Sequence, residues 1–67
     1  MPGINKNEFI DLFNQMYKTI KNYIYYKTGD IDLADDIAQE TFIKIWEKRN
    51  EIRLETIKSL LYKIAGN

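Results

Sequence analysis

Cysteine and histidine are both absent from this chain of 67 residues. Without cysteine, neither a disulfide framework nor a thiolate metal site can form. Without histidine, the chain lacks the commonest general base and the commonest transition-metal ligand. No loop has the alternating Asp/Asn pattern around a glycine that calcium-binding loops need. The residue inventory therefore predicts a protein that is not an enzyme and that uses no metal or other cofactor.

Long apolar runs are also missing, and no stretch approaches the length of a membrane-spanning helix. The beginning of the chain does not have the charged and then apolar pattern of a signal peptide. We therefore expect a cytoplasmic protein that makes no contact with a membrane. The length suits one domain with a small hydrophobic core.

Net charge is lacking too, because ten basic residues balance ten acidic ones. This balance argues against binding of nucleic acid by a polycationic surface. The charges are nevertheless segregated, since residues 30–47 carry six acidic side chains and one lysine, whereas residues 48–67 carry five basic and two acidic side chains. Such segregation is typical of a protein with two different partners, or with one partner that carries both signs of charge. Charge complementarity within the molecule is the competing explanation.

Apolar residues at helical spacing predict three helices, at about residues 7–28, 32–49 and 54–67. The inward stripe of the third helix begins at Leu54. Strand signals are absent from the sequence, and the short connections favour antiparallel neighbours. The predicted fold is therefore all-α, a three-helix antiparallel bundle.

Capping signals mark the ends of these helices. Asn5 begins a capping-box pattern before the first helix, and Gly29 suits a left-handed residue at its end. Either Asp30 or Asp32 would cap the second helix. Asn50 would take the left-handed position that ends it.

Residues 30–49 make the most informative helix. At about 100° per residue, its apolar stripe consists of Ala34, Ile37, Ala38, Thr41, Phe42 and Ile45, with Trp46 at the edge. The opposite side consists of Asp36, Gln39, Glu40, Ile43 and Glu47. An apolar centre with a polar rim is typical of a small binding surface. A single exposed isoleucine is also ordinary, and the projection alone favours a solvated face.

Two other groups of side chains allow both a functional and a structural interpretation. Carboxylates near the start of the second helix could form a catalytic or metal site, but the helix dipole explains them more simply; they are Asp32, Asp35, Asp36 and Glu40. A tyrosine cluster could stack on bases, but it more often lies at the edge of a core with its hydroxyls in water; it consists of Tyr23, Tyr25 and Tyr26.

The segment Asp32–Trp46 reads DLADDIAQETFIKIW. It resembles the second conserved region of bacterial extracytoplasmic-function sigma factors, whose pattern is D-x-A-x-D-(I/L/V)-x-Q-E-x-F-(I/L/V)-x-x-(W/Y), and every position of that pattern is matched. Residues 9–30 resemble the first helix of the family, and residues 60–67 resemble its motif W-L-(Y/F)-x-I-A-x-N. The resemblance covers about residues 8–67 and implies a sigma-factor region-two fold.

The resemblance implies that the chain binds RNA polymerase and takes part in transcription initiation. In the family, the second helix docks on the clamp helices of the polymerase β′ subunit, where arginines would pair with carboxylates. The implied polymerase-binding residues are Asp36, Gln39, Glu40, Ile43 and Trp46. The family's helix-turn-helix domain, called region four, is absent from this sequence. The resemblance also allows an anti-sigma factor as a partner.

The resemblance implies a second binding surface for promoter DNA. In the family, the loop before the last helix and the helix itself read the minus-ten element on the non-template strand and hold one flipped base. The implied DNA-binding residues are Asn50, Ile52, Arg53, Lys58, Tyr62, Lys63 and Asn67. Two positions depart from the family, since Ile52 stands where an aromatic residue is frequent and Leu60 stands where the family has tryptophan. We expect the isolated chain to bind DNA weakly, because few cations contact phosphate.

Two alternatives remain open on the sequence alone. The chain could be a generic three-helix protein-interaction module from another family, unrelated to polymerase. It could also bind DNA without polymerase, although its zero net charge argues against this.

Overall fold

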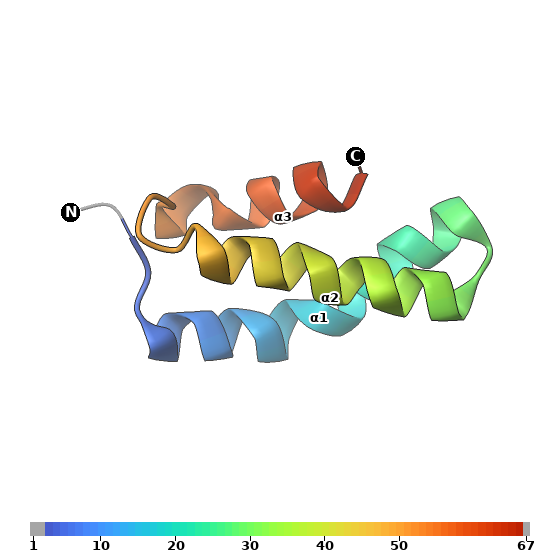
Figure 1. Ribbon diagram of the computed structural model, residues 1–67, viewed down its shortest axis with the longest axis horizontal. Coiled ribbons are helices and arrows are strands. Elements are labelled where there is room, and N and C mark those ends of the chain that lie inside the picture. The colour runs from blue at the N-terminus through green and yellow to red at the C-terminus, as the bar shows by residue number, and fades with distance from the viewer. Residues whose placement is uncertain (1–2, 67) are drawn as a thin grey trace.

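Three helices make up the fold of the computed structural model, which describes residues 3–66 (Figure 1). Helix α1 spans Lys6–Thr28, α2 spans Ile31–Glu47 and α3 spans Ile57–Gly66, and a single 3-10 turn, η1 (Leu54–Thr56), precedes α3. Successive helices run antiparallel, and α2 packs against both α1 and α3. The described residues contain no strand. The predicted all-α, three-helix antiparallel bundle is confirmed.

Side-chain caps explain where α1 and α2 begin. The Asn5 side chain accepts a hydrogen bond from the Glu8 amide at 2.8 Å, and the Glu8 carboxylate accepts one from the Asn5 amide at 2.9 Å. Gly29 ends α1 in the left-handed region with φ 70°. Asp30, rather than Asp32, caps α2, and its carboxylate accepts from two backbone amides of the first turn at 3.0 and 3.1 Å.

The connection between α2 and α3 differs from the prediction. Helix α2 ends at Glu47, and a turn follows in which the Glu51 amide donates to the Lys48 carbonyl at 2.9 Å. Asn50 does not take a left-handed conformation, because in residues 3–66 only glycines have positive φ. Leu54 was expected in the core but is half exposed. It lies in the tighter 3-10 turn, so its side chain is out of phase with the buried stripe of α3.

The hydrophobic core lies between the three helices and extends beyond them. Its buried members outside the helices are Ile4, which precedes α1, and Ile52, which lies in the loop between α2 and η1. The sequence did not indicate Ile4, because one apolar residue outside a periodic segment has no pattern to identify it. In the described part of the chain, no helix combines the length and the apolar character needed to cross a bilayer.

Candidate functional site

The outward side of α2 carries the residues that the resemblance predicts for polymerase binding. We call Asp36, Gln39, Glu40, Ile43 and Trp46 the α2 face. The three polar members are exposed, Ile43 is 56% exposed, and Trp46 is half-buried at the edge of the core. The structure thus brings all five residues to one side of a single helix, with an apolar residue at the centre.

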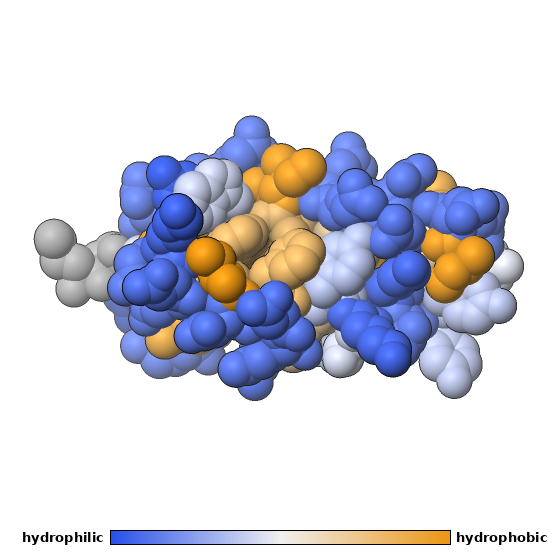
Figure 2. All heavy atoms as spheres, turned by 90° about the horizontal axis from the view of Figure 1, so that it is seen from below, coloured by the Kyte–Doolittle hydropathy of each residue, from blue (hydrophilic) through white to orange (hydrophobic). Residues whose placement is uncertain are grey.

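An apolar hollow of about 380 Å³ adjoins the α2 face where α1 meets α2. Its lining consists of Lys6, Phe9, Ile10, Ile43 and Trp46. The Phe9 and Trp46 ring centroids are 5.0 Å apart, so the wall is an aromatic pair. Figure 2 shows hydrophobic residues gathered near the middle of the side seen from below, with hydrophilic residues around them.

The contribution of α1 to this hollow was not predicted. Neither Phe9 nor Ile10 was predicted to take part in a surface site. Ile10 is exposed, and the signal that could have identified it is an isoleucine placed among polar residues, outside the apolar stripe of α1.

Glu40 lies on the other side of the α2 face, where α2 meets α3. It lines a smaller hollow of about 190 Å³ together with Ile37, Thr41, Lys44, Ile64 and Ala65. The α2 face therefore extends from the apolar hollow beside α1 to a charged edge beside α3. A partner that covers it would meet apolar contacts on one side and a carboxylate on the other.

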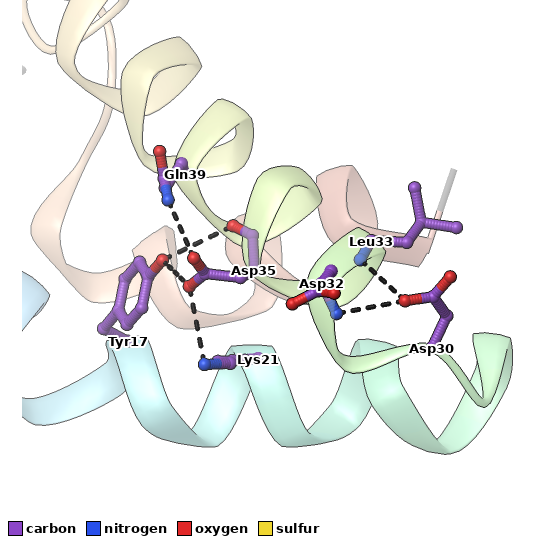
Figure 3. Close-up of polar contacts among 7 residues, drawn as sticks. All are labelled: Tyr17, Lys21, Asp30, Asp32, Leu33, Asp35 and Gln39. Atoms are coloured by element: carbon purple, nitrogen blue, oxygen red, sulfur yellow. Dashed lines mark hydrogen bonds and ion pairs between the residues drawn. The ribbon is translucent and has the colours of Figure 1, made fainter.

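A polar cluster between α1 and α2 supports Gln39, as Figure 3 shows. The Tyr17 hydroxyl donates to an Asp35 carboxylate oxygen at 2.5 Å, and the Lys21 ammonium lies 3.6 Å from the same oxygen. The Gln39 amide nitrogen donates to the second Asp35 oxygen at 3.0 Å, and its own oxygen points away from the cluster. Asp35 therefore orients Gln39 so that an acceptor faces outward.

The cluster changes the acidity of its members. The hydrogen bond from Tyr17, followed by the charge of Lys21, lowers the pKa of Asp35 below its ordinary value of 3.8, although partial burial opposes this. Burial, followed by the bond to Asp35, raises the pKa of Tyr17. Tyr17 thus remains a neutral donor and Asp35 an ionised acceptor across the neutral range. The sequence did not indicate this cluster, because its two principal members are eighteen positions apart.

We predict that this cluster makes stability fall in acid. The folded pKa of Asp35 is depressed, so its contribution is present above the unfolded pKa and is lost as pH falls through the folded value. Asp35→Asn should lower the melting temperature at about pH 6, and the difference from the parent should shrink at about pH 3. Thermal unfolding followed by circular dichroism measures both. Asp36→Asn, one residue outside the cluster, is the control, and an equal response in the two variants would contradict the prediction.

A third hollow, of about 420 Å³, lies between the loop and α3. Its lining consists of Glu51, Ile52, Arg53, Thr56, Ser59, Leu60 and Lys63. We call it the loop hollow. Three predicted DNA-binding residues meet there, namely Ile52, Arg53 and Lys63. Ile52 is only 6% exposed, so it closes the base of the hollow and belongs mainly to the core.

The other predicted DNA-binding residues lie outside the loop hollow. Lys58 lines a separate hollow between α1 and the start of α3. The Tyr62 ring packs edge-on against Tyr23 with centroids 5.0 Å apart. Asn50 is exposed on the loop but does not line the hollow, and Asn67 falls outside the described residues. Four residues that were not predicted also line the loop hollow, namely Glu51, Thr56, Ser59 and Leu60. Thr56, Leu60 and Lys63 recur at helical spacing, and this spacing is the signal that could have indicated that they share one face.

The carboxylates near the start of α2 are not gathered into one cluster. Asp30 caps the helix and Asp35 binds Tyr17. Among residues 3–66, no three acidic side chains come together in a way that could hold a metal ion. Tyr23 lies at the edge of the core, as the structural interpretation predicted, whereas Tyr26 is almost fully exposed.

Comparison with known proteins bears on the identity of these surfaces. Residues 12–67 match the family described as Sigma-70 region 2. RNA polymerase sigma factor YlaC of Bacillus subtilis (strain 168) is 34% identical over 62 residues, which is 91% of this chain and 36% of the relative. RNA polymerase sigma factor SigZ of the same organism is 34% identical over 58 residues, which is 85% of this chain and 33% of the relative. The chain thus spans about a third of the length of these relatives. No solved structure matches it significantly.

The family match includes α2 and α3 in full and most of α1. It also includes the segment Asp32–Trp46, on which the resemblance to extracytoplasmic-function sigma factors was based. A three-helix module from an unrelated family is therefore excluded. The prediction of a sigma-factor region-two domain is confirmed, and this chain belongs to the Sigma-70 region 2 family.

Proposed function

We propose that this chain is the domain of a transcription initiation factor that docks on the clamp helices of the RNA polymerase β′ subunit through the α2 face. The observation that carries the proposal is Ile43, which is 56% exposed between carboxylates and beside an apolar hollow. Large exposed apolar residues with a polar rim are typical of interaction surfaces. The membership of the chain in the Sigma-70 region 2 family supports RNA polymerase as the partner.

The chemistry of the α2 face fits the arginine-rich helices that the resemblance implies. Asp36 and Glu40 supply exposed carboxylates for charge-assisted hydrogen bonds. Ile43 and the adjoining hollow supply the apolar centre that a docked side chain would desolvate. The outward oxygen of Gln39 is held in place by Asp35 before binding, which reduces the entropy lost on association.

We propose that the loop hollow receives part of the minus-ten element, on the non-template strand, and so contributes to promoter recognition and melting. Arg53 and Lys63 at the hollow provide charges for phosphate. Ile52 and Leu60 provide an apolar base and wall against which an extruded nucleobase could lie. Without an aromatic ring in this lining, stacking on the base is weaker than in sites built around one.

The remaining partners follow from this assignment as proposals. The chain acts in the cytoplasm with the polymerase core enzyme, as a binding domain and not as an enzyme. An anti-sigma factor that covers the α2 face would compete with polymerase for the same residues. The names of the two relatives describe RNA polymerase sigma factors, and whole-protein activity of that kind is part of the proposal for this chain.

The test is isothermal titration calorimetry, in which the chain is titrated with a fragment that contains the β′ clamp helices. The parent should bind, and Glu40→Lys should weaken binding by about thirtyfold or more, because it replaces an attractive charge with a repulsive one. Asp11→Lys makes the same change on α1, away from the α2 face, and should bind like the parent. If both variants bind equally well with unchanged helicity, the proposed docking surface is wrong.

A further inference from the structure

We infer that Gly3 and Ile4 position the DNA-reading loop, as a strap that fixes the shape of the loop hollow; this inference rests on the proposed function of that hollow. The strap pairs with the loop through two backbone hydrogen bonds. The Gly3 amide donates to the Ile52 carbonyl at 2.8 Å, and the Ile4 amide donates to the Arg49 carbonyl at 2.8 Å. These bonds join the segment before α1 to both ends of a four-residue stretch of the loop.

Glycine is the only residue type that fits position 3 of the strap without strain. Its φ is +120°, a conformation that residues with a side chain rarely adopt. A Cβ atom built there would lie 3.2 Å from the Asn50 carbonyl oxygen and 3.4 Å from the Arg49 carbonyl oxygen. Both neighbours are backbone atoms, which cannot rotate away as a side chain can. The strap therefore passes as close to the loop as a backbone without a side chain allows.

Ile4 anchors the strap in the core. Its side chain is 5% exposed and belongs to the same buried cluster as Ile52, which is 6% exposed. Burial of an isoleucine side chain away from water stabilises this position of the strap. Because Ile52 forms the base of the loop hollow, the strap supports the hollow from beneath, both through the Ile52 carbonyl and through core packing.

The two ends of the loop depend on the strap to different degrees. On the α2 side, the Arg49 guanidinium donates to the Trp46 carbonyl at 2.8 Å and stacks over the Trp46 ring at 3.9 Å. These contacts hold Arg49 and the α2 face without help from the strap. On the hollow side, Ile52 and Arg53 follow the turn directly, and the Ile52 carbonyl accepts the Gly3 bond. Loss of the strap should therefore disturb DNA binding more than polymerase docking.

The experiment uses the 67-residue chain bound to a bacterial core RNA polymerase. The probe is a fluorescein-labelled single-stranded DNA oligonucleotide that is selected from a random pool by the parent complex, and its binding is followed by fluorescence anisotropy. Gly3→Ala should weaken binding by about fivefold or more, because the strained residue must either shift or displace the loop. Ile4→Ala should act in the same direction without backbone strain. Binding of both variants to the clamp-helix fragment should stay within about twofold of the parent.

Gly29→Ala is the matched control for a strained glycine. Gly29 also has positive φ, but nothing lies within 4 Å of its Cβ position, and its turn is at the opposite end of the molecule from the loop (Figure 1). The Gly29→Ala variant should be less stable than the parent but should bind the oligonucleotide equally well. Lys63→Ala is the control for the hollow itself and should weaken binding while leaving the strap intact.

The outcomes separate the inference from the proposed function. If Gly3→Ala and Ile4→Ala bind the oligonucleotide no worse than Gly29→Ala while Lys63→Ala is impaired, the strap has no positioning role and the proposed function stands. If docking on the clamp helices falls as much as DNA binding, the strap is merely structural. If the parent complex selects no oligonucleotide beyond those selected by core polymerase alone, the proposed function of the hollow is overturned, and the inference falls with it.

Discussion

Ile43→Arg should abolish detectable binding of the chain to the β′ clamp helices, with a loss of more than about a hundredfold, or roughly 3 kcal/mol. Ile43 is the apolar centre of the α2 face and lines the hollow beside α1. Arginine at this position removes the apolar contact and places a positive charge against an arginine-rich partner. The loss should exceed that of Glu40→Lys, because Glu40 lies at the edge of the face, where solvent screens its charge.

Ile31→Arg is the control for this experiment. It makes the same substitution in the same helix at a side chain that is 47% exposed, at the far end of α2 from the hollow. It should bind like the parent in calorimetry. If both variants bind with the affinity of the parent, polymerase docks elsewhere. If both lose affinity to the same extent, general surface charge, not the α2 face, controls binding.

Ile45→Ala should unfold a large fraction of the protein at room temperature. Ile45 is fully buried on the core side of α2, and replacing a buried isoleucine with alanine costs about 2–5 kcal/mol. A domain of this size has only about 3–5 kcal/mol of stability from its core. Urea denaturation followed by circular dichroism should therefore show a transition shifted to low denaturant, with a folded baseline that is short or missing.

Ile43→Ala separates packing from docking. It removes the same atoms two residues earlier on the same helix, but from an exposed side chain, so it should change the free energy of unfolding by less than about 0.5 kcal/mol. Ile43→Ala should thus be folded but bind the clamp helices weakly, whereas Ile45→Ala should be largely unfolded. A stable, cooperative Ile45→Ala variant would show that the core has another arrangement.

The two candidate surfaces meet at the end of α2. Trp46 lines the apolar hollow beside the α2 face. The Arg49 guanidinium stacks on the Trp46 ring, and the Arg49 carbonyl accepts a hydrogen bond from the Ile4 amide of the strap. The loop hollow begins within a few residues of that point. A polymerase helix on the α2 face and a DNA strand at the loop hollow would therefore lie near one another without sharing a contact residue in the proposals made above.

Much of the fold was predictable because helical periodicity and capping are local properties. The exposure of four residues of the α2 face, all except Trp46, followed from about 100° per residue within one helix. The Asn5 cap and the left-handed Gly29 followed from side-chain chemistry and backbone sterics. The errors fell in the connection after α2, where no period applies: Asn50 is not left-handed, and Leu54 lies in a 3-10 turn and not in the core stripe.

The sequence by itself therefore determined which side of each helix is apolar, which side chain caps α1, and which family the motif resembles. Only the tertiary structure decided which side chains from different segments meet. Phe9 joins Ile43 and Trp46 in one hollow, Tyr17 reaches Asp35, and Gly3 pairs with the loop. Such contacts depend on how the helices and loops pack in space, and residues eighteen or more positions apart share no local pattern that could reveal them.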